Sequence, residues 1–177
     1  MIKLLTLALL AAIVSVSLGS TAFAGTASST FTVTANVVKN CSINAANINF
    51  GSYDPVVANA TTALNMPSTV TVACTKSTAA TVVINAGSNF AGSGCAGLTT
   101  RAMSAGGGNF LCYDIYQPGA GNVSATTQVW GTAGAAIYNY TAASKAPVGL
   151  VDTGQIPPGQ DVAALTYNDS VIATINF

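Results

Sequence analysis

Apolar and polar residues alternate through the last stretch of the chain, YNDSVIATINF. This two-residue period is typical of a half-buried β-strand, which we expect over residues 171–177. One face of the predicted strand is apolar and consists of Val171, Ala173, Ile175 and Phe177. Nothing follows this segment that would pair with its far edge, so we expect another segment or another molecule to cover it.

A second alternating segment, STFTVTANVV, lies near the other end of the chain. Its apolar face consists of Phe31, Val33, Ala35 and Val37, with threonine or asparagine between them. The pattern predicts a strand. Two interpretations stay open. The segment is either free to join another molecule's sheet, or it is the first strand of the chain's own sheet and leads directly to Cys41.

The middle of the chain contains many short strand-like runs separated by turn residues. STVTVACT and ATVVINAG flank the polar stretch KSTA, which suggests a hairpin. LTTRAMS, NFLCYDIYQPG and a run ending at Ile156 predict further strands, while TQVWGTAG and AAIYNYTA are weaker candidates. No stretch combines helical periodicity with capping residues. We therefore predict an all-β sandwich that forms one domain, residues 39–177.

Residues 1–24 have the pattern of a secretory signal peptide. Lys3 precedes an apolar run, and the run ends in an Ala-Phe-Ala sequence that fits cleavage after Ala24. A membrane anchor is the alternative, but the apolar run is shorter than the ~20 residues that a bilayer requires. We expect an exported protein that passes through the periplasm to the cell surface, with no transmembrane segment after cleavage.

Charged side chains are scarce in this chain. It has five Lys or Arg, five Asp and no His, while 50% of its residues are hydrophobic. The hydrophobic fraction is sufficient for a core, and no basic patch is available to bind nucleic acid. A polar but nearly uncharged exterior suits a secreted structural protein. We expect Arg101 on the solvent-facing side of an edge strand, with ligand binding as the alternative.

Export favours disulfide formation among the four cysteines, which allow three pairings. Cys74 shares the apolar face of its predicted strand, so it points into the core, where Cys41 can meet it. Cys112 lies on the opposite face of its strand and faces the glycine-rich loop that holds Cys95. We therefore expect the pairs Cys41–Cys74 and Cys95–Cys112. A zinc site fails because the chain has no His, no Glu and no C-x-x-C pair.

The residues that catalysis usually requires are missing. Without His, no Ser-His-Asp or Cys-His arrangement is possible. The Asp residues lie mostly in turn-like contexts, which makes a paired-carboxylate hydrolase a remote alternative. We expect no enzyme activity, no cofactor and no metal. One binding alternative remains, a sugar-binding or adhesive patch of Trp130, Tyr138 and Tyr140, although core packing is the simpler interpretation.

Several short motifs follow one another in the order of a known family. CSI, INFGSYDP, STVTVACT, RAM, LCYDIYQ, VWGT, IPPGQDV and YNDSVIATINF together resemble the spore coat protein U domain. That domain is also the fold of subunits in archaic chaperone–usher pili, and the resemblance covers nearly all of the mature chain. Tyr167 matches a family Tyr just before the last strand, which implies a structural role as a tyrosine corner. Where many members have a Gly before this Tyr, the chain has Ala164 and Leu165.

The resemblance implies an immunoglobulin-like sandwich that lacks its last strand and leaves a hydrophobic groove beside residues 171–177. In such families a periplasmic chaperone lends a strand to the groove, and the N-terminal segment of the next subunit then replaces it. Residues 25–38 would be this donor segment, with Phe31 and Val33 among its inserted side chains. The implied partners are copies of this chain or related subunits, the chaperone and an outer-membrane usher. The alternative function is a self-complete secreted binding module or coat component.

Overall fold

The computed structural model describes residues 24–177. The predicted signal peptide therefore lies outside the described residues, except for Ala24. The chain divides into two units after Asn36, and each is described by itself. Residues 24–40 have no regular secondary structure, and every described strand lies within the unit formed by residues 37–177.

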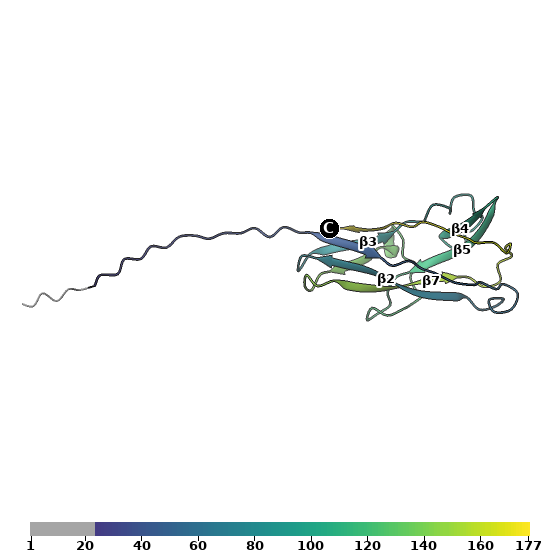
Figure 1. Ribbon diagram of the computed structural model, residues 1–177, viewed down its shortest axis with the longest axis horizontal. Helices are drawn as coiled ribbons and strands as arrows, with labels where there is room; N and C mark the ends of the chain where they lie inside the picture. The colour runs from purple at the N-terminus through teal and green to yellow at the C-terminus, as the bar shows by residue number, and fades with distance from the viewer. Residues whose placement is uncertain (1–23) are drawn as a thin grey trace, which may run out of the picture. The chain divides into compact units, whose positions relative to one another are not determined.

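Two antiparallel sheets form the second unit (Figure 1). Its strands are β1 Cys41–Ala45, β2 Leu64–Cys74, β3 Ala79–Ile84, β4 Arg101–Gly106, β5 Asn109–Tyr116, β6 Tyr138–Thr141, β7 Val148–Ile156 and β8 Ala173–Asn176. One sheet has five strands in the order β1-β2-β7-β5-β4, and the other has three in the order β6-β3-β8. One 3-10 turn, η1 Gly134–Ala136, is the helical structure of the described residues. The predicted all-β sandwich is confirmed.

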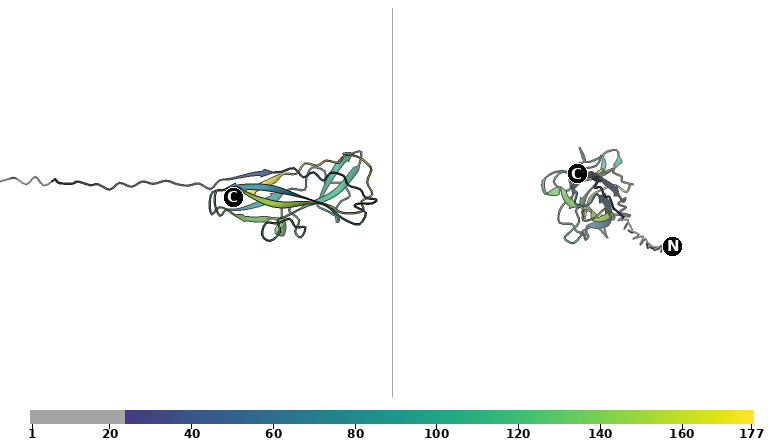
Figure 2. Two further views of the ribbon diagram at one scale, coloured as in Figure 1. Left: turned by 60° about the horizontal axis from the view of Figure 1, so that its bottom comes forward. Right: turned by 90° about the vertical axis from the view of Figure 1, so that its left-hand side faces the viewer.

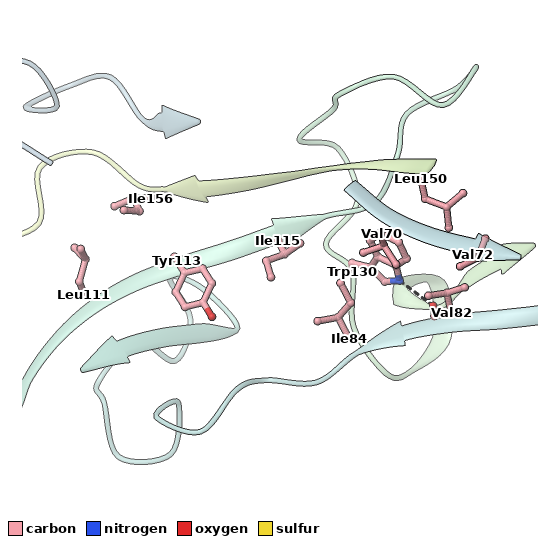
Figure 3. Close-up of a cluster of buried hydrophobic side chains, with 10 residues drawn as sticks. All are labelled: Val70, Val72, Val82, Ile84, Leu111, Tyr113, Ile115, Trp130, Leu150 and Ile156. Atoms are coloured by element: carbon pink, nitrogen blue, oxygen red, sulfur yellow. Dashed lines mark hydrogen bonds between the residues drawn. The ribbon is translucent and has the colours of Figure 1, made fainter. Parts of the chain in front are cut away.

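Alternating side chains of both sheets meet in one hydrophobic core (Figure 3). The strands form because every second residue is apolar, so that one face of each strand leaves water when the sheets stack. The buried cluster comprises Val70, Val72, Val82, Ile84, Leu111, Tyr113, Ile115, Trp130, Leu150 and Ile156. Each fully buried side chain of this size stabilises the fold by about 1.5–3 kcal/mol.

The aromatic residues considered as an adhesive patch belong to this core. Trp130 is fully buried and donates its indole N–H to the carbonyl of Val82 at 2.8 Å. Tyr138 packs against the Trp130 ring with 5.5 Å between ring centroids, and Tyr140 also packs against the core. These side chains thus contribute to packing, the simpler of the two interpretations, and they do not form an exposed adhesive patch.

The hairpin suggested for β2 and β3 is also wrong, because these strands belong to different sheets. β2 pairs with β1 and β7, whereas β3 pairs with β6 and β8. The connection turns at Ser77, whose φ is 65°, and is tied to the end of β6 through the bond from the Ser77 N–H to the Ala142 carbonyl. The chain thereby crosses from one sheet to the other, and the apolar faces of the two strands stack instead of lying side by side.

Arg101 is buried, which contradicts the solvent-facing position expected for it. Its exposed fraction is 1%, although β4 is an edge strand. The guanidinium donates hydrogen bonds to the carbonyls of Asn85, Ile84 and Trp130. Its Nη1 lies 3.8 Å from a carboxylate oxygen of Asp114. Burial lowers the pKa of Arg101. The side chain links β4 to the end of β3, where it supplies hydrogen-bond donors to the carbonyls of Ile84 and Asn85.

Two disulfides join the pairs that the strand faces indicate. Cys41 and Cys74 are register partners on β1 and β2, and their sulfurs are bonded. Cys95 and Cys112 connect the glycine-rich loop to β5 and are buried together. No cysteine of the described residues is free. The first disulfide secures the short edge strand β1 to its neighbour β2, and the second secures a long loop to β5.

Candidate strand-accepting groove

β8 is an edge strand of the three-stranded sheet. It pairs with β3 on one side, from Ala173 opposite Ile84 to Asn176 opposite Thr81, and within residues 24–177 no strand pairs with its other side. Regular strand structure covers residues 173–176, which is shorter than the strand predicted over residues 171–177. Just before it, the Ile172 N–H donates to the side-chain oxygen of Asn85 at 2.8 Å. The predicted alternation agrees with the burial of Ala173 and Ile175, which pack against the core, but Val171 and Phe177 on the same predicted face are 37% and 54% exposed. Of these four expected groove residues, Val171 and Ala173 line the groove described below, whereas Ile175 and Phe177 do not.

β1 occupies the matching position at the edge of the five-stranded sheet. It pairs with β2 alone, and the chain from Ala46 to Ala63 continues without strand structure. β1 and β8 lie close to each other, but they belong to different sheets. Within residues 24–177 no strand pairs with both β1 and β8, so no shared strand joins the two sheets, seen from two further directions in Figure 2, on this side of the sandwich.

A groove of about 1510 Å³ opens on this side. Residues 45–56 form one wall, and residues 162–171 together with Ala173 form the other. The floor consists of core residues, namely Val70, Ile84, Met103, Leu111, Tyr113, Ile115 and Ile156. Figure 3 shows how most of these side chains converge from the two sheets. The groove therefore leads from the surface directly to the hydrophobic core, a shape that suits an extended apolar segment.

One carboxyl group, that of Asp152, lies in the apolar floor. Asp152 is 2% exposed, and its Oδ1 has no hydrogen-bond partner among the described residues. Burial raises the pKa of Asp152 to about 6. Its neighbour across the β2–β7 ladder is Ser68, and no Lys or Arg is found among the described residues that line the groove. The groove thus contains a polar position near the middle of β7 that an inserted segment would cover.

Hydrogen bonds hold the walls of the groove in place. The Tyr53 hydroxyl donates to the carbonyl of Pro157 at 2.8 Å and accepts the backbone N–H of Gln160 at 3.0 Å. The Tyr113 hydroxyl donates to Asp169 at 2.8 Å, and burial together with this carboxylate raises the pKa of Tyr113. The walls therefore depend on side chains that connect loops distant in sequence.

Tyr167 makes the short-range bond that a tyrosine corner requires. Its hydroxyl donates to the carbonyl of Ala163 at 2.9 Å, four residues upstream. The ring packs against the core and lines the groove. Tyr167 thus fixes the chain that leads into β8, which is the structural function the resemblance implies.

Sequence reasoning missed two features of the groove. Asp152 alternates with Leu150 and Ile156 on the buried face of β7, so the period of two places it in the core. Gly154 faces the same way, and a Cβ there would lie 2.7 Å from the ring of Phe50. Alternation within VGLVDTGQI was therefore a usable signal for both positions. The closeness of Phe50 could not be seen in the sequence, because more than one hundred residues separate it from Gly154.

The N-terminal segment of the described chain has no strand of its own. Phe31, Val33 and Val37 have exposed fractions of 86%, 81% and 80%. Neither sheet includes any residue before Cys41, so the interpretation of this segment as the first strand of the chain's own sheet is not what the structure shows. The folded unit begins where the Thr75 hydroxyl donates to the Val38 carbonyl at 3.1 Å.

The described residues contain no group of three or more metal-ligating side chains. Among the same residues, no helix is long and apolar enough to cross a membrane. The main features of the described residues are the unpaired edges of β1 and β8, a groove that reaches the core, and an exposed alternating segment. They define a pilin-type sandwich.

Comparison with known proteins agrees with this class and shows the family. The Spore Coat Protein U domain model matches residues 27–174, and the chain belongs to this family. Protein U of Myxococcus xanthus is 33% identical over 166 residues, which cover 89% of each chain. The resemblance inferred from the ordered motifs is thereby confirmed.

A solved structure shares the fold. It is the crystal structure of the CsuC–CsuE chaperone-tip adhesion subunit pre-assembly complex from the archaic chaperone–usher Csu pili of Acinetobacter baumannii. The match has a TM-score of 0.54 and 24% identity, and it covers 80% of this chain. This chain spans only 40% of the matched one.

Proposed function

We propose that this protein is an exported structural subunit that polymerises by donor-strand exchange into a surface pilus, fimbria or coat. Residues 25–38 of one copy would fill the groove of the next, with Phe31, Val33, Ala35 and Val37 facing the core. The observation that carries the proposal is the groove between residues 45–56 and residues 162–171, whose floor is the hydrophobic core itself. The protein is thus a building block without catalytic activity.

The magnitudes support such a joint. Full burial of three large side chains, those of Phe31, Val33 and Val37, would contribute about 5–9 kcal/mol. A ladder of backbone hydrogen bonds to the free edge of β8 would add about 1 kcal/mol for each bond. The burial energy is available because these side chains are exposed in the chain by itself. The hydrogen-bond energy is available because residues 24–40 have no regular secondary structure. Ordering the segment costs part of this energy, but a stable non-covalent joint remains.

The geometry of exchange determines the kind of assembly. Each copy gives a segment to one neighbour and receives one from another, so the contact is heterologous and generates an open fibre. An empty groove exposes core side chains and an unpaired strand edge, which promotes aggregation. We therefore propose that a periplasmic chaperone covers the groove during export and that an outer-membrane usher directs the exchange. The likeness to a chaperone–subunit complex supports the chaperone.

Deletion of residues 25–38 tests the proposal. We expect the full mature chain to form heat-resistant and detergent-resistant ladders in gel electrophoresis, and the deletion variant to form none. The synthetic peptide STFTVTANVV should instead bind the deletion variant and keep it soluble. A deletion variant that still polymerises would exclude this donor segment. A mature chain that is a soluble monomer, indifferent to the peptide, would favour the self-complete binding module.

A further inference from the structure

The exposed charges of the sandwich lie at its two ends. At one end, Lys76 and Lys145 line a common hollow of about 600 Å³ with Asn40. Both neighbours of Lys39 are hydrogen-bonded to Thr75, the residue before Lys76. The Thr75 hydroxyl donates to the Val38 carbonyl, and the Thr75 N–H donates to the Asn40 carbonyl. Lys39 therefore lies at the same end of the sandwich as Lys76. We call this region the basic end and define it as Lys39, Lys76 and Lys145.

Two carboxylates define the other end, Asp54 and Asp161. Asp54 opens the turn that ends at Asn59, and Asp161 follows Gln160. The two loops are joined because Tyr53 bonds to Pro157 and Gln160, as described above. Both carboxylates are exposed, and backbone N–H groups of Val56 and Val57 lower the pKa of Asp54, which keeps it ionised. We call this region the acidic end.

The basic end and the acidic end lie at opposite ends of the long strands. β7 begins three residues after Lys145 and ends five residues before Asp161. Its 9 residues correspond to a length of about 30 Å. Of the remaining charged side chains of the described residues, Arg101, Asp114 and Asp152 are buried, with Arg101 beside Asp114. Asp169 is half-buried on the groove wall and accepts a hydrogen bond from the Tyr113 hydroxyl. The sandwich is thus positive at one end and negative at the other.

The groove opens at the acidic end, and the donor segment leaves the sandwich at the basic end. Tyr53, Pro55 and Val162, which flank the two acidic residues in sequence, line the groove at the acidic end. The donor segment continues into Lys39, the first residue of the basic end. A strand from Thr30 to Val38 has the same length as β7, about 30 Å. The groove is lined from Ala45 and Ala173 to Pro55 and Val162, so a segment inserted from the acidic end would leave Lys39 at the mouth beside Asp54 and Asp161.

We propose that the basic end of one copy docks on the acidic end of the next, with Lys39 beside Asp54 and Asp161 at the groove mouth. This inference rests on the proposed donor-strand exchange and adds two points, the direction of insertion and a contact between opposite charges of adjacent subunits. We call this contact, Lys39 of one copy with Asp54 and Asp161 of the next, the electrostatic seam. The opposite direction would bring two basic ends together, which like-charge repulsion disfavours. Opposite charges at the mouth also attract the incoming segment and raise the rate of association.

A pair of synthetic peptides tests the seam separately from the exchange. One peptide is STFTVTANVVK, residues 29–39, and the other carries Lys39→Asp. Both are labelled, and their association with the mature chain is measured by fluorescence anisotropy at low and at high salt. We expect the natural peptide to associate about five- to tenfold faster at low salt, and the difference to shrink at high salt. With the Asp161→Lys chain, the preference should reverse.

The outcomes distinguish the two proposals. If neither peptide binds, the donor-strand proposal fails. If both bind at the same rate, and Asp161→Lys does not change this, donor-strand exchange stands and the electrostatic seam is overturned. Because Asp161 is exposed in a loop, its replacement should leave the fold intact, which circular dichroism of the variant checks.

Assembly of whole chains provides a second measurement. Lys39→Asp and Asp161→Lys should each slow ladder formation several-fold at low salt, and the double variant should recover most of the rate. Asn139→Lys is the matched control, because it adds a positive charge at an exposed position of β6, on the side of the sandwich. Combined with Lys39→Asp, it should not restore the rate. Equal recovery by this control would show an effect of net charge and overturn the pairing.

Discussion

Arg101 and Asp152 show two different ways in which this sandwich buries an ionisable side chain. Arg101 has carbonyl acceptors and a nearby carboxylate, so the cost of removing its charge from water is largely offset. Asp152 has an oxygen without a partner in the described part of the chain, and burial raises its pKa to about 6. A buried carboxylate of this kind destabilises the fold when it is ionised.

The pH dependence of stability should reveal the ionisation of Asp152. The pKa of about 6 in the folded chain lies above the ordinary value of 3.8 for an Asp side chain. The favourable contribution of the protonated form is therefore complete below about pH 4 and is lost as the pH rises through about 6. At pH 7, Asp152→Asn should raise the free energy of unfolding by about 2–3 kcal/mol. Denaturant unfolding at pH 4 and pH 7 measures this difference.

Asp161→Asn is the control for this measurement because Asp161 is exposed. That substitution should leave the pH profile between 4 and 7 nearly unchanged. If Asp152→Asn and the parent chain lose stability equally over this range, the carboxyl group of Asp152 is not the source of the pH dependence.

The donor segment and β8 both alternate apolar and polar residues, but they differ in how their apolar faces are buried. Each has an apolar face, but β8 packs its face on the core while the donor segment exposes its own. A strand that presents one apolar face and two free backbone edges gains both burial and hydrogen bonds when it joins another sheet. The alternation of side chains therefore determines which residues of the donor segment are sensitive to substitution.

Neighbouring substitutions in the donor segment should differ sharply in their effect. Val33→Asp places a carboxylate on the face that enters the groove, and we expect it to reduce ladder formation at least tenfold because the charge loses its water. Thr32→Asp places the same group on the opposite face and should change ladder formation by less than about twofold. Densitometry of unboiled samples measures both. Similar losses for the two variants would contradict the proposed facing.

At the scale of the whole molecule, the groove makes the sandwich incomplete. The sheets cover the core except between the segment that follows β1, residues 45–56, and the segment that precedes β8, residues 162–171, where core side chains line an open groove. A ligand that binds the folded chain and not the unfolded chain stabilises it by mass action. The stability of this protein should therefore depend on what occupies the groove.

The melting temperature should rise with the concentration of the donor peptide. At a peptide concentration of 100 Kd, STFTVTANVV should stabilise the mature chain by about 2.7 kcal/mol. This corresponds to an increase in Tm of roughly 5–11 °C for a domain of this size. Differential scanning fluorimetry with a scrambled peptide as control measures the effect. A Tm that does not respond to the peptide would indicate a sandwich that is already complete.

The sequence by itself determined the features that depend on local alternation. A period of two decides which face of a strand is buried, because successive side chains point to opposite sides of the backbone. This rule was sufficient for the all-β class, for the inward position of Cys74 and for the apolar face of Ala173 and Ile175. The exposed alternation at Phe31 and Val33 was readable in the same way.

Only the tertiary structure decided which strands pair and what lies between them. The stretch KSTA has the composition of a hairpin turn, but it crosses between sheets because the apolar faces of β2 and β3 gain more by stacking on each other. The walls of the groove, residues 45–56 and 162–171, are separated by more than one hundred residues. The burial of Arg101 depends on carbonyls from two other segments, the end of β3 at Ile84 and Asn85, and Trp130. These arrangements follow from packing across the whole chain, which no local pattern of residues specifies.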